Sequence, residues 1–166
     1  MIPELGHYCL IIALCFSVLI TVLPMVGSYS NNVMLMQSAR SLSAGLFVFV
    51  TLAFGCLVWS FVQDDFSVAF VAHYSNKILP LHYKLTATWG GHEGSLLLWI
   101  FWLSIWLFSV SIFTRSLPMI IRSRVLSVMA FTITGILLFT LFTSNPFDRI
   151  LPGAPGDGRD LNPLLQ

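Results

Sequence analysis

The stretch Ser95–Phe113 reads S-L-L-L-W-I-F-W-L-S-I-W-L-F-S-V-S-I-F and contains no Asp, Glu, Lys or Arg. An α-helix rises about 1.5 Å per residue, so roughly 20 mostly apolar residues cross the ~30 Å hydrocarbon core of a bilayer. A run of this length and composition therefore predicts a helix that spans a membrane.

Three further segments have the same character, and they are Leu5–Leu23, Ser41–Val62 and Val125–Thr143. Of the 166 residues, 57% are hydrophobic and 9% are charged, whereas soluble proteins average about one-quarter charged residues. We predict an all-α, polytopic membrane protein with four transmembrane helices in a single membrane domain over 1–166. Membrane lipid is its expected surrounding, and a net charge of +1 offers no basic surface for nucleic acid.

The positions of the arginines predict which ends of the helices lie in the cytoplasm. The link T-R-S-L-P-M-I-I-R-S-R at 114–124 has three arginines and no acid, and Arg40 lies between the first two spans. Short loops rich in Lys and Arg are retained on the cytoplasmic side. The N-terminus, an outer loop at 63–94 and an outer tail at 144–166 are then expected on the opposite face, together with all seven acids and all four histidines.

The outer loop and the outer tail carry weaker local patterns. Bulky residues alternate with small or polar ones over Phe66–Phe70, which favours a short strand or an extended stretch on the bilayer surface. Pro80 interrupts any helix in the middle of the loop. The tail has four prolines and three glycines and ends without a closing element, which indicates an irregular segment and the N-terminal fragment of a larger protein.

The segment T-W-G-G-H-E-G-S at 88–95 places an imidazole and a carboxylate among glycines. A zinc-protease helix needs H-E-x-x-H, but Leu96 stands at the position of the second histidine. The glycines do not have the G-x-G-x-x-G spacing of a dinucleotide loop and are expected to permit close backbone packing. Glu93 either stabilises the N-terminus of the third span, where the helix dipole favours an acid, or forms an outward-facing binding surface with His92.

Trp99, Trp102 and Trp106 recur at intervals of three and four residues, so they share one face of the third span. Tryptophan usually lies at the headgroup level, which leaves two interpretations for a stripe inside the span. The stripe is a packing surface for another helix, or its rings stack against a flat apolar ligand. Ser104, Ser109 and Ser111 are small residues that favour close helix contacts.

The run Y-K-L-T-A-T-W-G-G-H-E-G-S-L-L-L-W at 83–99 resembles the N-terminal part of the CcmF/NrfE family of cytochrome c biogenesis proteins. Other stretches resemble the same family, and they are M-I-P-E-L-G-H at 1–7, D-D-F-S-V-A-F-V-A at 64–72, L-F-T-S-N-P-F at 141–147 and G-R-D-L-N-P-L-L-Q at 158–166. These blocks follow the family's order and cover nearly the whole chain.

The resemblance implies a multi-pass protein of the bacterial inner membrane, with both termini in the periplasm, that forms part of a haem lyase. Such a protein takes haem from a haem chaperone and, with other cytochrome c maturation subunits, promotes thioether attachment to apocytochrome c. The family's Trp-rich haem-handling segment and haem-ligating histidines correspond to positions after Gln166. The resemblance therefore implies no catalytic residue and no metal ligand in this segment, and the candidate haem-contacting surface consists of Trp89, His92, Glu93 and Trp99.

Other functions stay open from the sequence. The chain could be a structural membrane subunit that scaffolds a complex, or an inactive truncated fragment with no haem chemistry of its own. Whether the segment alone is an enzyme is open, as is the choice between the general cytochrome c and nitrite reductase branches. A transporter or channel is disfavoured because the predicted spans lack the intramembrane charges that mark an ion path.

Overall fold

The computed structural model describes residues 1–114, 116–150, 153 and 155–159. These residues form six helices, α1 (Ile2–Ser30), α2 (Val33–Val62), α3 (Ala69–Tyr74), α4 (Leu81–Ala87), α5 (His92–Phe113) and α6 (Met119–Thr143). The helices α1, α2, α5 and α6 are each long and apolar enough to cross a membrane. The predicted all-α fold with four membrane helices is therefore confirmed for the part of the chain that is described.

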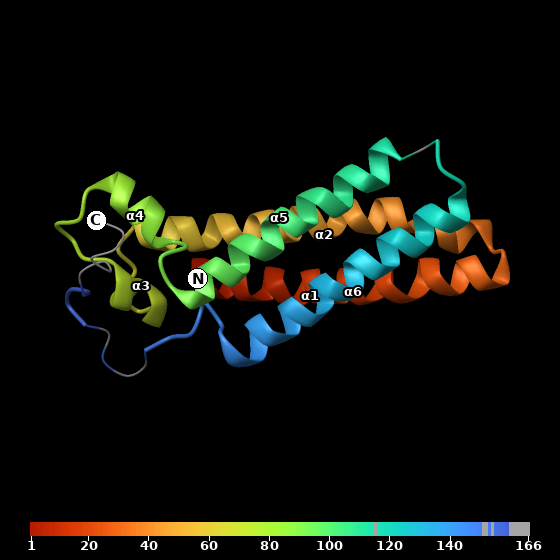
Figure 1. The fold of residues 1–166 in the computed structure, drawn as a ribbon. Coiled ribbons are helices and arrows are strands. Elements are labelled where there is room, and N and C mark those ends of the chain that lie inside the picture. The colour runs from red at the N-terminus through yellow and green to blue at the C-terminus, as the bar shows by residue number, and fades with distance from the viewer. Residues whose placement is uncertain (115, 151–152, 154, 160–166) are drawn as a thin grey trace.

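The four long helices alternate in direction (Figure 1). The N-terminus, the short helices α3 and α4 and the described part of the tail gather at one end, which contains all four histidines and is called the histidine end. The α1–α2 turn and the start of α6 lie at the other end, which is called the arginine end after Arg40, Arg122 and Arg124. The acids among the described residues all lie at the histidine end.

The turn between α1 and α2 consists of Asn31 and Asn32. Asn31 has φ 53°, in the left-handed region that asparagine tolerates better than most residues. The Asn32 N–H donates to the Gly27 carbonyl at 3.0 Å, and the Asn32 side chain accepts from the Met34 N–H at 3.0 Å. The same pair of asparagines ends one helix and caps the next, so α1 and α2 form a tight antiparallel hairpin.

Aromatic stacking joins α5 to α2. Phe47 stacks on Phe108 and Phe54 stacks on Phe101, with ring centroids 5.5 and 5.3 Å apart. Such offset ring pairs add about 0.5–1.5 kcal/mol each to the energy of burial. Phenylalanines, rather than the tryptophans of the same helix, thus provide the main aromatic contact between α5 and the bundle.

Hydroxyl groups join α6 to α1. The Ser127 hydroxyl donates to the Ile20 carbonyl at 3.1 Å, and the Thr134 hydroxyl donates to the Ser17 hydroxyl at 3.0 Å. Hydrogen bonds between membrane helices contribute about 0.6 kcal/mol on average. Small hydroxyl residues let the backbones of α1 and α6 approach each other. In α5, Ser104 is likewise buried, which agrees with the small-residue contact predicted there.

The tail folds back over the histidine end. Arg149 forms an isolated antiparallel bridge with Val68, and its guanidinium group bonds to Glu4 at the start of α1. The Phe147 ring lies directly on Gly6, so closely that any side chain at Gly6 would overlap it. The tail therefore ties α1 to the segment that follows α2.

An ion pair fixes α4 to the end of α2. The Lys84 ammonium nitrogen lies 2.6 and 2.5 Å from the two carboxylate oxygens of Asp64. Lys84 is only 7% exposed, and Asp64 follows α2 with φ 53° in the left-handed region. The ion pair offsets the free-energy cost of burying the Lys84 charge away from water.

The observed helix limits differ from those expected from hydropathy. Limits of 2–30, 33–62, 92–113 and 119–143 replace the expected 5–23, 41–62, 95–113 and 125–143. Hydropathy marks the part of a helix that suits hydrocarbon, whereas backbone hydrogen bonding continues through polar residues on either side. The arginines Arg122 and Arg124 thus belong to the first turns of α6 and not to a loop.

The segment expected as an outer loop at 63–94 contains α3, α4 and the first turn of α5. The strand expected at Phe66–Phe70 is wrong, because only Val68 is bridged and α3 begins at Ala69. The short helix buries three successive residues, Phe70 to Ala72, which an alternating strand cannot do. Pro80 does precede a helix start, at Leu81. Arg115 and residues 160–166 of the expected link and tail lie outside the described residues.

Candidate functional site

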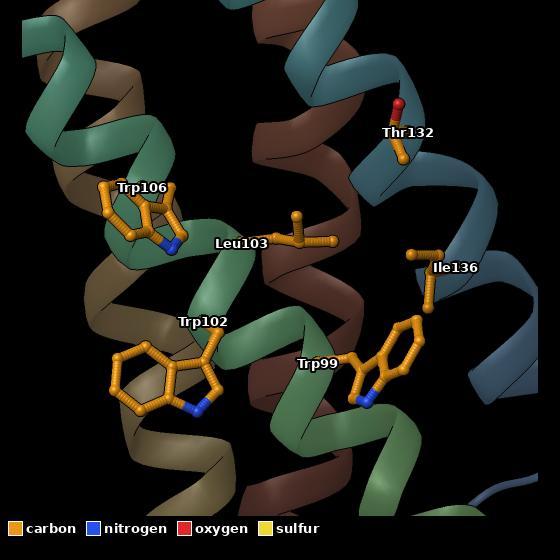
Figure 2. Close-up of a pocket in the computed structure, with 6 residues that line it drawn as sticks. All are labelled: Trp99, Trp102, Leu103, Trp106, Thr132 and Ile136. Atoms are coloured by element: carbon orange, nitrogen blue, oxygen red, sulfur yellow. The ribbon is translucent and has the colours of Figure 1, made fainter.

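An open apolar hollow of about 420 Å³ lies between α5 and α6 (Figure 2). Its lining residues are Trp99, Trp102, Leu103, Trp106, Thr132 and Ile136, and it is called the tryptophan groove. Trp99 and Leu103 point from α5 toward α6, while Trp102 and Trp106 lie along the outer side of α5 (Figure 2). The three indoles are 66%, 54% and 61% exposed in chain order.

The tryptophan stripe faces away from the bundle. The opposite face of α5 is the buried one and includes Leu97, Ile100, Ser104, Leu107 and Ser111. In the described part of the chain no helix covers the indoles, so a helix that packs on the stripe would have to come from outside the described residues. Its rings are available to lipid, to another protein surface or to a ligand.

A second hollow of about 380 Å³ extends the tryptophan groove toward the histidine end. It is lined by His92, Ser95, Leu96 and Trp99, which lie on one face of α5. Trp99 lines both hollows. The exposed surface is therefore continuous from His92 at the first turn of α5 to Trp106, almost four turns further along the helix.

The imidazole of His92 has one engaged and one open nitrogen. Its Nδ1 lies 3.0 Å from the Ser144 hydroxyl, and its ring meets Phe139 edge to face at 6.0 Å. Both contacts come from the end of α6, so they hold the ring in one orientation. Nε2 has no partner among the described residues and is available to a ligand in the second hollow.

The four candidate residues of the sequence analysis divide into two pairs. His92 and Trp99 line the same hollow, whereas Trp89 and Glu93 line neither. Glu93 is half-buried in the first turn of α5, where the dipole favours a carboxylate, although the helix has no side-chain cap. The Trp89 carbonyl accepts a hydrogen bond from the Ser95 hydroxyl at 2.7 Å, which ties the preceding turn to the helix.

Close packing explains the glycines around His92. A Cβ atom at Gly91 would lie 2.6 Å from the Phe70 ring and 2.7 Å from the Tyr74 ring of α3. A Cβ atom at Gly94 would overlap the backbone carbonyl of Thr88. The glycines therefore let the start of α5 pack directly against α3 and against the residue after α4. This packing sets the position of His92.

Two adjacent residues after α6, Ser144 and Asn145, were missed as site residues in the sequence. Ser144 contacts His92, while the Asn145 amide nitrogen lies 3.1 Å from Nδ1 of His7 on α1. Two adjacent tail residues thus orient His7 and His92, which are far apart in the sequence. The polar pair directly after an apolar span, in S-N-P-F, is the signal that could have drawn attention to them.

The other two histidines do not join this arrangement. His73 in α3 and His82 in α4 are exposed on the short helices. Within the described residues, no group of three His, Cys, Asp or Glu side chains is placed to hold a metal ion. The chemistry that the site supports is stacking and apolar contact along α5, with a single imidazole at one end.

The chain has related sequences over its whole length. The sequence profile of the family described as "Cytochrome C assembly protein" matches residues 89–166. Over 166 residues, the chain is 55% identical to the cytochrome c-type biogenesis protein CcmF of Pseudomonas aeruginosa, 49% to that of Escherichia coli and 43% to the protein NrfE of Haemophilus influenzae. Each alignment covers 100% of this chain and 25%, 26% and 26% of the respective relative.

A solved structure described as "Cytochrome c Heme Lyase CcmF" has the same fold. It superposes with a TM-score of 0.82 at 26% sequence identity, over 89% of this chain and 25% of that chain. The chain therefore spans about a quarter of the length of the relatives that it matches.

Proposed function

Because this chain belongs to the CcmF and NrfE family of cytochrome c-type biogenesis proteins and corresponds to its N-terminal part, we propose that it acts within a haem lyase that attaches haem to apocytochrome c. The observation that carries the proposal is 55% identity to a CcmF protein across the entire chain. The segment contributes four membrane helices and the small cap at their histidine end. The covalent reaction itself requires groups outside this segment.

The protein acts in the bacterial inner membrane, with the histidine end in the periplasm and the arginine end in the cytoplasm. The support for this orientation is that Arg40, Arg122 and Arg124 lie at one end, while the described acids lie at the other. In this orientation the histidine end faces a haem chaperone, apocytochrome c and the other maturation subunits.

Cysteine labelling is expected to report this orientation. In a variant without the native Cys9, Cys15 and Cys56, Lys77→Cys should react with a membrane-impermeant maleimide in intact spheroplasts, because Lys77 is exposed at the histidine end. Ser116→Cys, exposed at the opposite end, should react only after the membrane is opened. Labelling is read as a gel shift, and the reverse order of reaction would contradict the orientation.

The tryptophan groove is the surface through which the segment helps to handle haem. Its indole faces are exposed over two turns of α5, and the flat apolar face of a porphyrin stacks on such rings. The described residues fit the ring of haem better than its iron, since His92 is the one imidazole that lines the surface. Bound haem would supply the vinyl groups that react with apocytochrome cysteines, and the role of this chain is to bind and orient the ring along α5.

A chimera tests the proposed function. The corresponding N-terminal quarter of Escherichia coli CcmF, which is 49% identical, is replaced by this chain in a strain that lacks its own CcmF. Holocytochrome c is then measured by haem staining of separated proteins. Restored holocytochrome c is expected, and a chimera that is present in the membrane at the normal level but inactive would argue against the proposal.

Within the active chimera, Trp99→Ala is expected to reduce the holocytochrome c yield severalfold. Loss of an aromatic anchor at a binding surface costs about 2 kcal/mol, or roughly thirtyfold in affinity. The amount of chimera in the membrane should stay the same, because a 66% exposed side chain contributes little to the fold. Phe131→Ala on α6 is the matched control, since Phe131 is 68% exposed but lies outside the tryptophan groove.

A scaffold that never touches haem is the second candidate function. It is favoured by the exposure of the indoles on the face of α5 that points away from the bundle, where they are equally suited to pack on another protein surface. On this alternative the chimera is active, and Trp99→Ala and Phe131→Ala have equal effects. A selective loss with Trp99→Ala, together with less haem in the absorption spectrum of the purified chimera, would instead support direct contact.

A further inference from the structure

A hollow of about 420 Å³ opens at the arginine end, between α2 and α6. It is lined by Gln37 and Arg40 of α2 and by Met119 and Arg122 of α6. Two guanidinium groups and a carboxamide therefore converge on one space from two different helices. The planar fork of N–H donors on each arginine matches the geometry of phosphate oxygens.

The positive charge of this hollow is not neutralised by the described part of the chain. The side chains of Arg40 and Arg122 make no hydrogen bond or ion pair with any described residue, and the described acids lie at the histidine end. Arg124 differs, because its Nε donates to the Ser28 hydroxyl at 3.1 Å and its guanidinium lies over the Tyr29 ring at 5.2 Å. Of the three described arginines at this end, two have guanidinium groups available to an anion, while the third contacts α1.

The depth of the two arginines places them at the level of lipid headgroups. Arg40 lies about 33 Å along α2 from Val62, and Arg122 lies about 32 Å along α6 from Thr143, at 1.5 Å of rise per residue. These lengths match the ~30 Å thickness of the hydrocarbon core. When the histidine ends of both helices lie at one membrane boundary, the arginines lie together at the other.

Beyond Arg122, α6 exposes apolar side chains toward the membrane centre. Val125, less than one turn after Arg122, and Val128 are 41% and 59% exposed. A ligand with an anionic head at this depth would have its apolar tail in the hydrocarbon beside α6, which free phosphate cannot do. We infer that this hollow binds the phosphate of an anionic membrane lipid, with the acyl chains lying along α6, and this inference does not depend on the proposed function.

Binding is tested with the purified full chain in a non-ionic detergent. Native mass spectrometry measures retention of phosphatidylglycerol and of phosphatidylcholine, and the melting temperature is recorded with each lipid and with inorganic phosphate alone. We expect one phosphatidylglycerol to be retained and to raise the melting temperature. The double variant Arg40→Gln with Arg122→Gln should lose about thirtyfold in affinity, the combined effect of two charged contacts at a bilayer surface.

Arg124→Gln is the control for position, since it removes one positive charge at the same end but outside the hollow, where the double variant removes two inside it. It should retain phosphatidylglycerol within about twofold of the unaltered chain, well below the thirtyfold expected for the double variant. Met119→Trp fills the hollow without altering charge and should weaken retention even if the double variant does not fold. Undiminished retention in both hollow variants would overturn the inference, as would equal stabilisation by inorganic phosphate at the same concentration, which would assign the site to the free anion.

Discussion

Gly94→Ala is expected to lower the free energy of unfolding by about 3 kcal/mol, at the upper end of the usual cost of overpacking. The added methyl group would overlap the carbonyl oxygen of Thr88, the C-cap residue that follows α4. A backbone carbonyl cannot rotate away as a flexible side chain can, so the α4–α5 turn has to shift as a unit. Urea unfolding of the purified chain in detergent, followed by tryptophan fluorescence, measures the change.

The matched control is Gly135→Ala, because a Cβ atom at Gly135 in α6 has nothing within 4 Å. Alanine in a helix interior is more favourable than glycine by about 0.5–1 kcal/mol, so this variant should be unchanged or slightly more stable. Equal destabilisation by the same substitution at both positions would mean that the contact between Gly94 and Thr88 does not limit the packing of α5.

Lys84→Met is expected to lower the free energy of unfolding by about 2 kcal/mol. Removing one partner of a buried ion pair costs about 3–5 kcal/mol, and the lower value follows because the Asp64 side chain is 23% exposed and keeps some contact with water. Asp64→Asn should cost more, about 3 kcal/mol, because it leaves the buried Lys84 ammonium without its partner, while asparagine preserves the left-handed backbone. Both changes are measured by the same urea unfolding.

The double variant Lys84→Met with Asp64→Asn separates pairing from simple loss of charge. It should be more stable than the sum of the single effects predicts, because no unpaired charge is left behind. Asp148→Asn, at an exposed acid near the same end, is the control and should change stability by less than about 0.5 kcal/mol. Strict additivity of the two single effects would show that the pair contributes nothing as a pair.

Hydropathy was sufficient to predict the four membrane helices but not all of their ends. The ends at Val62, Phe113 and Thr143 were predicted correctly, because polar or charged residues follow closely. The α1–α2 turn was placed too widely, since Asn31 and Asn32 reverse the chain through a left-handed conformation that no hydrophobic pattern records. Local hydrogen bonding, not polarity, sets these limits.

The sequence predicted that the tryptophans share one face of α5 but not where that face points. In water the apolar face of a helix is the buried one, but in a bilayer the surrounding lipid is as apolar as the protein interior. The buried face of α5 in fact contains Ser104 and Ser111, while the exposed face contains the tryptophans. In α5, the serines predicted the buried face of the helix better than the tryptophans did.

The candidate site was predictable only where it is local. His92 and Trp99 could be paired from helical spacing, and they do line one hollow. The contact between His92 and Ser144 joins residues 52 positions apart, and the contact between His7 and Asn145 joins residues 138 apart. Such pairs follow from the path of the chain between helices, which a single sequence does not reveal.

The contacts between the tail and α1 can form only late in synthesis of this segment. Glu4 and Arg149 are 145 positions apart, so α1, α2, α5 and α6 have all been synthesised before the partner of Glu4 leaves the exit tunnel. The same delay applies to Gly6 and the Phe147 ring that covers it. The cap at the histidine end therefore assembles after these four helices, and a stalled nascent chain that lacks α6 would expose the beginning of α1 to quality-control proteases.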